Sequence, residues 1–260
     1  MVSVTQRIKQ VKQPWGGYIR PKTAFHVQQF DDETVLNDEE NIHPILVGLL
    51  VDYLTRFMNG APLEDAFKVS LQGAKNISEY ELAKAFLKHV KGLDDESIRC
   101  AHKLVEFDVY YRVQMSSFYR SMQKENSPVL TDETIENVRT MVLRSLAFIE
   151  NYGPITKDGF TFEGAYTDVV TIGDGDYLTA DTLWDFKVSK KEPNKDQTLQ
   201  ILIYYIMGKH SNYLEFNNIQ NLGIFNPRLN KAYSLSVSDI SDEIITEVSE
   251  KVIGLSLIHI

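Results

Sequence analysis

The sequence predicts an α/β (α+β) fold in which an N-terminal helical region precedes a core with a mixed β-sheet flanked by helices. Between about residues 44 and 149, apolar side chains recur every three or four positions, which is the spacing of an amphipathic helix. After Pro154, segments rich in β-branched and aromatic residues alternate with helical segments in the order β-β-α-β-β-α. That order is typical of a mixed sheet covered by helices.

Residues 1–30 are expected to form a basic extended arm, because two prolines and two glycines interrupt any regular pattern there. The helical region is expected over residues 31–130. Its helices are predicted in the segments 43–60, 62–74, 78–92 and 94–123.

The core is expected over residues 131–254 and opens with a helix over 131–150. Strands are predicted at 160–172, 181–188, 221–227 and 231–238, and further helices at 195–210 and 242–254. The sequence "GDGD" at 173–176 predicts the turn between the first two strands. The last residues, 255–260 ("LSLIHI"), resemble translated sequencing-adapter sequence, so we set them apart as a tail that need not be native.

Composition limits the class of protein. The chain has 260 residues, 43% of them hydrophobic and 24% charged, which is typical of a globular protein with an ample core. It has no apolar run long enough for a membrane span and no apolar secretory leader, so we expect a cytoplasmic protein without a membrane partner. A lone cysteine, Cys100, excludes internal disulfides, cysteine-based zinc sites and four-cysteine iron–sulfur clusters.

Charge is distributed unevenly along the chain. The net charge of −9 argues against a protein that coats nucleic acid. Residues 1–30 nevertheless carry five basic side chains and no acid, and "KVSKKEPNK" at 187–195 is a second basic strip. Such strips can bind phosphate on an otherwise acidic protein, so this loop is either a solvated surface or a nucleic-acid contact. Trp15, Tyr18 and Arg20 could likewise stack on nucleic acid, although packing against the protein is favoured.

The candidate catalytic residues lie on the predicted hairpin. Asp168 and Asp185 lie at similar distances from its turn, so strand pairing would bring their Cβ atoms to about 5–8 Å. Two carboxylates that close repel unless a cation lies between them, and oxygen ligands favour Mg²⁺. Lys187 shares a strand face with Asp185, where it could orient a water and stabilise developing negative charge. This set suits metal-assisted hydrolysis of a phosphodiester.

The following helix adds a polar pair. Gln200 and Tyr204 are four residues apart and share one face of a helix that is otherwise largely apolar. Asp174 and Asp176 compete as carboxylates, but we interpret them as turn residues, and Asp181 is a minor candidate.

The segments "GAYTD", "WDFK" and "QILIY" resemble the motif series Gly-x-x-(x)-Asp, Asp-x-Lys and Gln-x-x-x-Tyr of the PD-(D/E)xK nuclease superfamily. The likeness covers roughly residues 130–240 and is nearest to the RecB-type exonuclease branch. It implies a restriction-endonuclease-like core. It also implies roles for five residues, with Asp168 and Asp185 as metal ligands, Lys187 as catalytic lysine, and Gln200 and Tyr204 as the accessory pair.

Relatives of this kind often add an acid or histidine from upstream. Glu163, Glu150, Glu106 and His102 are all open for that position, with Glu163 preferred as the third metal ligand. The chain departs from the pattern in lacking the cysteines of the iron–sulfur members and any helicase motif, and residues 1–130 match no domain that we can name.

The resemblance implies a nuclease that uses Mg²⁺ or Mn²⁺ to hydrolyse DNA, as an exonuclease rather than an endonuclease. By analogy, its setting would be DNA repair, recombination or defence against mobile DNA. RNA stays open as a substrate. The alternative is a non-catalytic acidic interaction protein that uses the fold as a scaffold. The helical region could serve a protein partner or self-association in either case.

Overall fold

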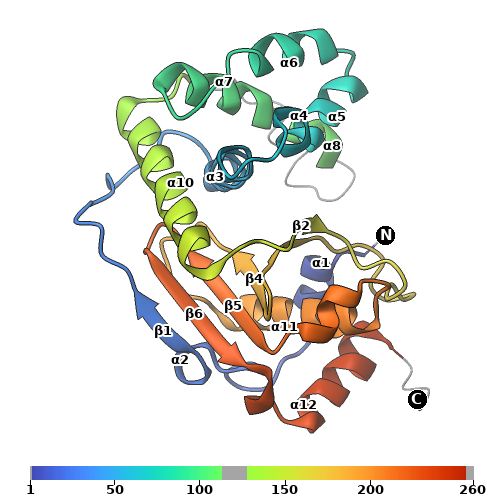
Figure 1. Cartoon of the computed structure of the whole chain (residues 1–260). Coiled ribbons are helices and arrows are strands. Elements are labelled where there is room, and N and C mark those ends of the chain that lie inside the picture. The colour runs from blue at the N-terminus through green and yellow to red at the C-terminus, as the bar shows by residue number, and fades with distance from the viewer. Residues whose placement is uncertain (1, 113–127, 256–260) are drawn as a thin grey trace. The chain divides into compact units, whose positions relative to one another are not determined.

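The computed structural model describes residues 2–112 and 128–255 and confirms a mixed α/β fold (Figure 1). The chain divides into two compact units. Unit 1 combines residues 1–30 with 149–260, and unit 2 comprises residues 31–148. We describe each unit by itself. None of the described helices is both long and apolar enough to cross a membrane.

Unit 1 is built on a six-stranded mixed sheet with the strand order β1-β6-β5-β4-β3-β2. The strands are β1 (His26–Gln29), β2 (Lys157–Phe160), β3 (Gly175–Leu178), β4 (Thr182–Phe186), β5 (Asn221–Asn226) and β6 (Lys231–Ser236). Among these strands β4 and β5 pair in parallel, and the other neighbours are antiparallel. The predicted strands at 181–188, 221–227 and 231–238 are thereby confirmed.

The helix α11 (Lys195–His210) is the crossover that connects β4 to β5 (Figure 1). Asn194 begins it with a capping box, because its side chain accepts from the amide of Gln197 while the Gln197 side chain accepts from the amide of Asn194. Most of the helix is buried, including Leu199, Ile203 and Met207. The helix predicted at 195–210 is confirmed.

The two faces of the sheet differ in chemistry. Leu183 and Asp185 on β4 share a face with their β5 partners Leu222 and Ile224, and Leu183, Leu222 and Ile224 join the core formed with α11. The opposite face is aromatic. Its ring contacts join Trp184 to Tyr152 at 5.2 Å, Phe186 to Phe225 at 5.1 Å, Tyr177 to Phe186 at 4.6 Å and Phe30 to Phe225 at 6.3 Å between ring centroids.

Residues 1–30 differ from the predicted extended arm. They form α1 (Val4–Gln10), α2 (Pro21–Ala24) and β1, which completes the sheet beside β6. Burial explains the difference, because Val4, Ile8 and Ile19 lie in the unit 1 core. The prolines and glycines separate short elements instead of keeping the segment extended.

The strand predicted at 160–172 is wrong. The chain leaves the sheet after β2, and residues 161–174 run outside its ladders apart from an isolated bridge between Ser3 and Ile172. Side chains bond the backbone in place of a ladder. Thr167 Oγ1 accepts from the amides of Val169 and Val170 and donates to the Ile253 carbonyl, and Tyr166 donates to the Gly173 carbonyl at 3.0 Å. Residues 175–176, predicted as turn, begin β3 instead.

In unit 1, one short helical element lies between α11 and β5, and three more follow β6. These are η1 (Leu214–Asn218), η2 (Val237–Asp239), α12 (Asp242–Glu247) and η3 (Val248–Ile253). The helix predicted at 242–254 corresponds to α12 and η3 together. The predicted tail at 255–260 lies outside the described residues except for Leu255.

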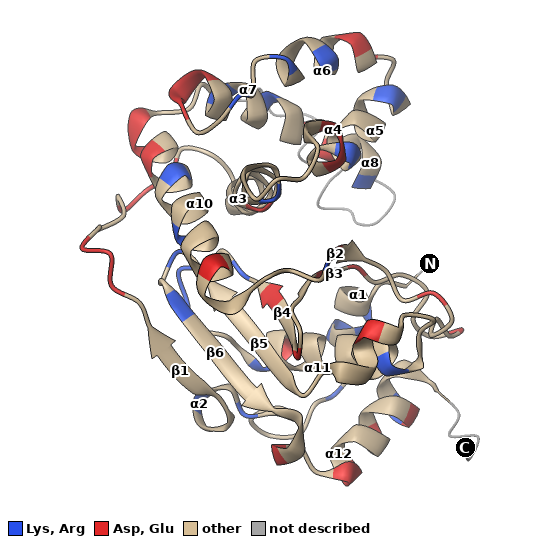
Figure 2. Ribbon diagram, viewed as in Figure 1, with Lys and Arg blue, Asp and Glu red and all other residues tan. Residues whose placement is uncertain are grey.

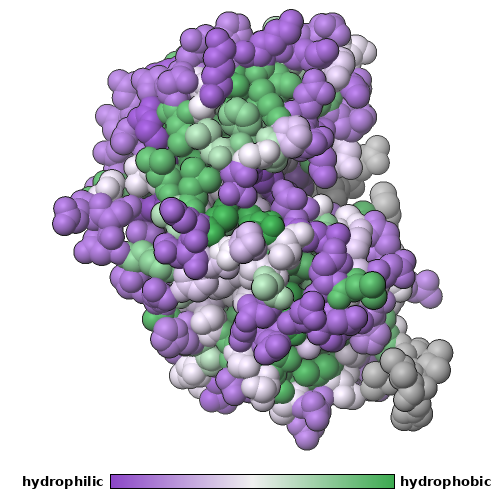
Figure 3. Space-filling model, in the orientation of Figure 1, coloured by the Kyte–Doolittle hydropathy of each residue, from purple (hydrophilic) through white to green (hydrophobic). Residues whose placement is uncertain are grey.

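Unit 2 is helical, as predicted. Its helices are α3 (Pro44–Met58), α4 (Leu63–Ala66), α5 (Lys68–Asn76), α6 (Tyr80–Leu87), α7 (Asp95–Val105), α8 (Asp108–Arg112) and most of α10 (Asp132–Tyr152). The part of the predicted helix 94–123 beyond Arg112 lies outside the described residues. Figure 3 shows apolar surface, in green, over unit 2 in the region of α3 and α7.

The division between the units falls within α10, at residues 148 and 149. We had assigned the whole of this helix to the core at 131–254. Polar bonds fix its first half within unit 2. Asn137 donates to the Asn37 carbonyl at 3.0 Å, and the Arg144 guanidinium binds the carboxylate of Asp32 at 2.6 and 2.9 Å.

Gly223→Ala tests the close packing of the sheet. A Cβ at Gly223 would lie 2.2 Å from a ring carbon of Trp184, so the variant must displace a buried indole. We expect it to lower the free energy of unfolding by about 1–3 kcal/mol, measured by urea titration with Trp184 emission. The control is Gly48→Ala on α3, where a Cβ meets no atom within 4 Å and the change should stabilise by up to about 1 kcal/mol. Equal stability of Gly223→Ala and wild type would contradict the packing.

His102 should make unit 2 sensitive to acid. Its side chain is buried, and burial lowers its pKa from 6.5 to about 4, with a smaller contribution from the nearby charge of Lys103. The folded state therefore resists protonation. Stability is complete above pH 6.5 and is lost as the pH falls toward 4, by at most about 3 kcal/mol.

His102→Gln should flatten this part of the pH profile of urea unfolding between pH 7.5 and 4. The matched control is His89→Gln, because His89 lies on the surface of the same unit, with a side chain 57% exposed. Parallel profiles for wild type and His102→Gln would show that this histidine does not govern the acid response.

Candidate active site

Asp185 is the centre of the candidate site. It lies near the end of β4, its residue is 1% exposed, and Lys187 Nζ lies 2.9 Å from Oδ1 and 2.7 Å from Oδ2. Burial raises the pKa of Asp185, and the ammonium group of Lys187 offsets part of that rise. Within the described residues, Oδ2 receives no aligned hydrogen bond despite its ion pair. One oxygen of this carboxylate is therefore available as an acceptor.

The polar pair of α11 faces the same carboxylate. Gln200 Nε2 donates to the Tyr204 hydroxyl at 2.8 Å, and both side chains are buried. The pKa of Tyr204 is raised well above its usual value by burial first and by the charge of Asp185 second. The structure thus brings together four of the predicted site residues: Asp185, Lys187, Gln200 and Tyr204.

The second carboxylate is Asp176, which we had interpreted as a turn residue. It lies on β3, and its Oδ2 accepts from the amide of Phe186 at 2.8 Å. β3 and β4 are antiparallel, and Tyr177 pairs with Trp184. The next pair along the ladder is therefore Asp176 opposite Asp185. Residues opposite each other in an antiparallel ladder point to the same face, with Cβ atoms about 4.5–5.5 Å apart.

A signal for Asp176 was present in the sequence. Gly173 stands three residues before it, so Gly173-x-x-Asp176 satisfies the Gly-x-x-(x)-Asp motif as well as Gly164 and Asp168 do. The preference for Asp168 rested on an assumed strand at 160–172.

Contrary to the prediction, Asp168 does not join this group. Its residue is exposed, on the segment between β2 and β3 that lies outside any ladder, so its expected strand pairing with Asp185 is wrong. The reason is the local set of side-chain bonds made by Thr167, which fixes this segment away from the sheet.

The upstream candidates belong to several elements of the two units. Glu163 is exposed, and its carboxylate accepts from Thr161 and, at 2.7 Å, from Tyr213, which lower its pKa in that order. His102 lies on α7 and Glu106 is the C-cap of that helix, both in unit 2. Glu150 is exposed on α10 of unit 1, and Asp181 lies before β4 with its carboxylate bonded to Thr182.

The candidate site offers carboxylate oxygens, which are the type of ligand that a hard divalent cation prefers. Within the described residues, no three His, Cys, Asp or Glu side chains gather as a metal-binding group. Mg²⁺, however, usually keeps several waters and takes one or two protein carboxylates together with substrate phosphate. Asp176 and Asp185 supply two carboxylates on one face, and Asp185 Oδ2 retains acceptor capacity.

A basic loop borders the site. Residues 187–194 connect β4 to α11, and the loop together with Lys195 carries four lysines (Figure 2 shows Lys and Arg in blue). Asn226 at the end of β5 anchors the loop by donating to the Ser189 carbonyl at 2.9 Å. Glu192, the one acid in the loop, is paired with Lys231 at 2.6 Å. The remaining charge of the loop is positive.

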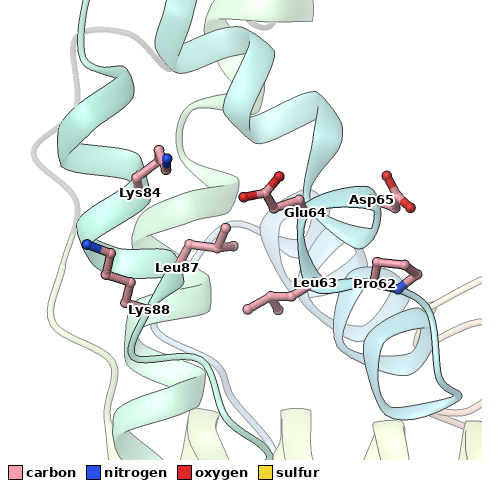
Figure 4. A pocket seen from close by; sticks show the side chains of 7 residues that line it. All are labelled: Pro62, Leu63, Glu64, Asp65, Lys84, Leu87 and Lys88. Carbon is pink, nitrogen blue, oxygen red and sulfur yellow. The ribbon is translucent and has the colours of Figure 1, made fainter.

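A separate hollow lies in unit 2 and has a volume of about 660 Å³ (Figure 4). Lys84 and Lys88 stand on one wall and Glu64 and Asp65 on the other, so its charges balance. It contains none of the predicted site residues and does not select for an anion.

Comparison of the chain with protein-family models, with curated proteins and with solved structures finds no match.

Lys187→Met should expose the cost of burying Asp185. Without the ammonium group, the carboxylate is left without its ion-pair partner, which typically costs about 3–5 kcal/mol. We expect a lower thermal midpoint in EDTA and a larger gain on adding Mg²⁺ or Mn²⁺ than wild type shows. The control is Lys191→Met on the exposed part of the basic loop. If both variants have the thermal midpoint of wild type, the ion pair with Lys187 does not offset the free-energy cost of burying the Asp185 carboxylate.

Proposed function

We propose that the protein is a nuclease that depends on Mg²⁺ or Mn²⁺ and hydrolyses phosphodiester bonds of DNA. The observation that supports this is the convergence of Asp176, Asp185 and Lys187 with the α11 pair Gln200 and Tyr204. These residues follow the order of the PD-(D/E)xK motif series, with Asp176 in the position first given to Asp168. The resemblance to the RecB-type branch favours removal of nucleotides from an end.

The proposed residues divide the work by their chemistry. Asp176 and Asp185 would hold the cation, which when bound neutralises phosphate charge and lowers the pKa of a bound water. Lys187, already directed at Asp185, donates to the attacking water or to the phosphate oxygen on which charge develops. Water adds to phosphorus as the ester P–O bond breaks, and the leaving oxygen takes up a proton.

The α11 pair would position these groups. Gln200 donates through its amide to Tyr204, which leaves its carbonyl oxygen able to accept from Lys187 or water. Tyr204 supports this arrangement from a fully packed position, since its residue is 5% exposed.

The test is cleavage of linear single-stranded, linear duplex and circular DNA with Mg²⁺, Mn²⁺ or EDTA. Asp176→Asn, Asp185→Asn and Lys187→Met should each lower the rate by about 100- to 1,000-fold, as the loss of a charge-stabilising group does. Asp168→Asn is the matched control and should cleave like wild type, because Asp168 lies outside the site. Resistance of the circular substrates would support attack from an end.

Absence of cleavage by folded wild type on all three substrates, and on RNA of the same lengths, would refute the nuclease. The acidic scaffold would then be the better explanation. Loss of cleavage in Asp168→Asn with retention in Asp176→Asn would refute the assignment of the second carboxylate.

A further inference from the structure

Trp15 is the most exposed large apolar side chain among the described residues of unit 1. Its exposed fraction is 89%, against 78% for Leu214 and 48% for Val27. A single exposed apolar side chain needs no explanation by itself. The way in which the surrounding turn is held, and the charges beside it, give this one a specific use.

The turn that carries Trp15 is fixed to the start of α11. Gly17 donates to the Pro14 carbonyl at 2.9 Å, and Gly17 has φ of 91°, in a region that favours glycine. Gln13 Nε2 donates to Asp196 Oδ1 at 2.7 Å, and a Cβ at Gly17 would lie 2.7 Å from Lys195 Cβ. The backbone is thus docked while the indole remains in solvent.

The segment that carries the indole is rich in positive charge. The Arg20 guanidinium lies 5.7 Å from the Trp15 ring centroid, within the range of a cation–π contact. Lys195 lies directly beneath the turn, and Lys12 and Lys22 are exposed on the same segment. The nearest acid on α11, Asp196, is bonded to Gln13. An aromatic face beside unpaired positive charge is complementary to a base and its phosphate.

The turn and the candidate site share one helix. Lys195 and Gln200 are five residues apart on α11, which is about 7.5 Å along the axis and roughly 140° around it.

We propose that Trp15 and Arg20 form a stacking site for an unpaired base of single-stranded DNA, at the start of the helix that carries Gln200 and Tyr204. This inference rests on the proposed function and names the form of its substrate. An indole can stack only on a base whose face is free, and the basic side chains engage the backbone on either side.

Binding can be measured without cleavage. A fluorescently labelled oligonucleotide of twelve thymidines is titrated with protein in EDTA at fixed salt, and anisotropy gives the dissociation constant. Trp15→Ala should raise this constant by about 5- to 100-fold, and Trp15→Phe should restore most of the affinity. Leu214→Ala is the matched control, because Leu214 is 78% exposed on η1, which packs near Gly208 toward the other end of α11.

Intrinsic fluorescence gives a second readout. The chain has two tryptophans, and Trp184 is buried at 2% exposure, so quenching by the unlabelled oligonucleotide reports on Trp15. A duplex of the same length should bind wild type and Trp15→Ala equally, since its bases are already stacked.

The outcomes separate the two proposals. Binding that depends on Trp15, without cleavage in Mn²⁺, supports the stacking site and refutes the nuclease. Cleavage with Mn²⁺ together with equal binding by wild type and Trp15→Ala refutes the stacking site and leaves the nuclease. Failure of wild type to bind the oligonucleotide, or equal weakening by Leu214→Ala, also overturns the stacking site.

Discussion

Parallel strands cannot be joined by a tight turn, and β4 and β5 are a parallel pair at the centre of the unit 1 sheet. The chain must therefore leave the sheet after β4, cross one face and return, and α11 is that crossover. Because α11 packs on the face that carries Asp185, its buried Tyr204, which is bonded to Gln200, lies within the electrostatic influence of this carboxylate. The candidate site is a consequence of strand direction as much as of side-chain choice.

The same arrangement places a carboxylate where the core would otherwise be apolar. The neighbours of Asp185 on this face of the sheet are Leu183, Ile224 and the opposing Asp176, and among the contacts described only Lys187 supplies a full opposite charge. A buried ion pair rarely adds net stability, because desolvation offsets the attraction. Folding stability alone therefore does not account for this buried ion pair.

Local patterns were sufficient for much of the fold and site. The alternation in β4 placed Asp185 and Lys187 on one face, and the spacing on α11 paired Gln200 with Tyr204, whereas their proposed roles rest on the motif resemblance. Non-local interactions decided the rest. The segment 161–174 is rich in strand-forming residues, yet Thr167 bonds to the distant Ile253 carbonyl, and no local pattern reveals such a partner. The place of β1 in the sheet likewise depends on β6, far along the chain.

Unit 1 is formed from both ends of the described chain, with unit 2 inserted between its two parts. During translation β1 is made long before its partner, since about 200 residues separate Gln29 from Lys231. At 5–20 residues per second, the ribosome needs about 10–40 s to supply β6. Throughout that interval the buried face of α1 and the edge of β1 lack their final partners, so unit 2 can fold while the sheet that surrounds Asp185 is still incomplete.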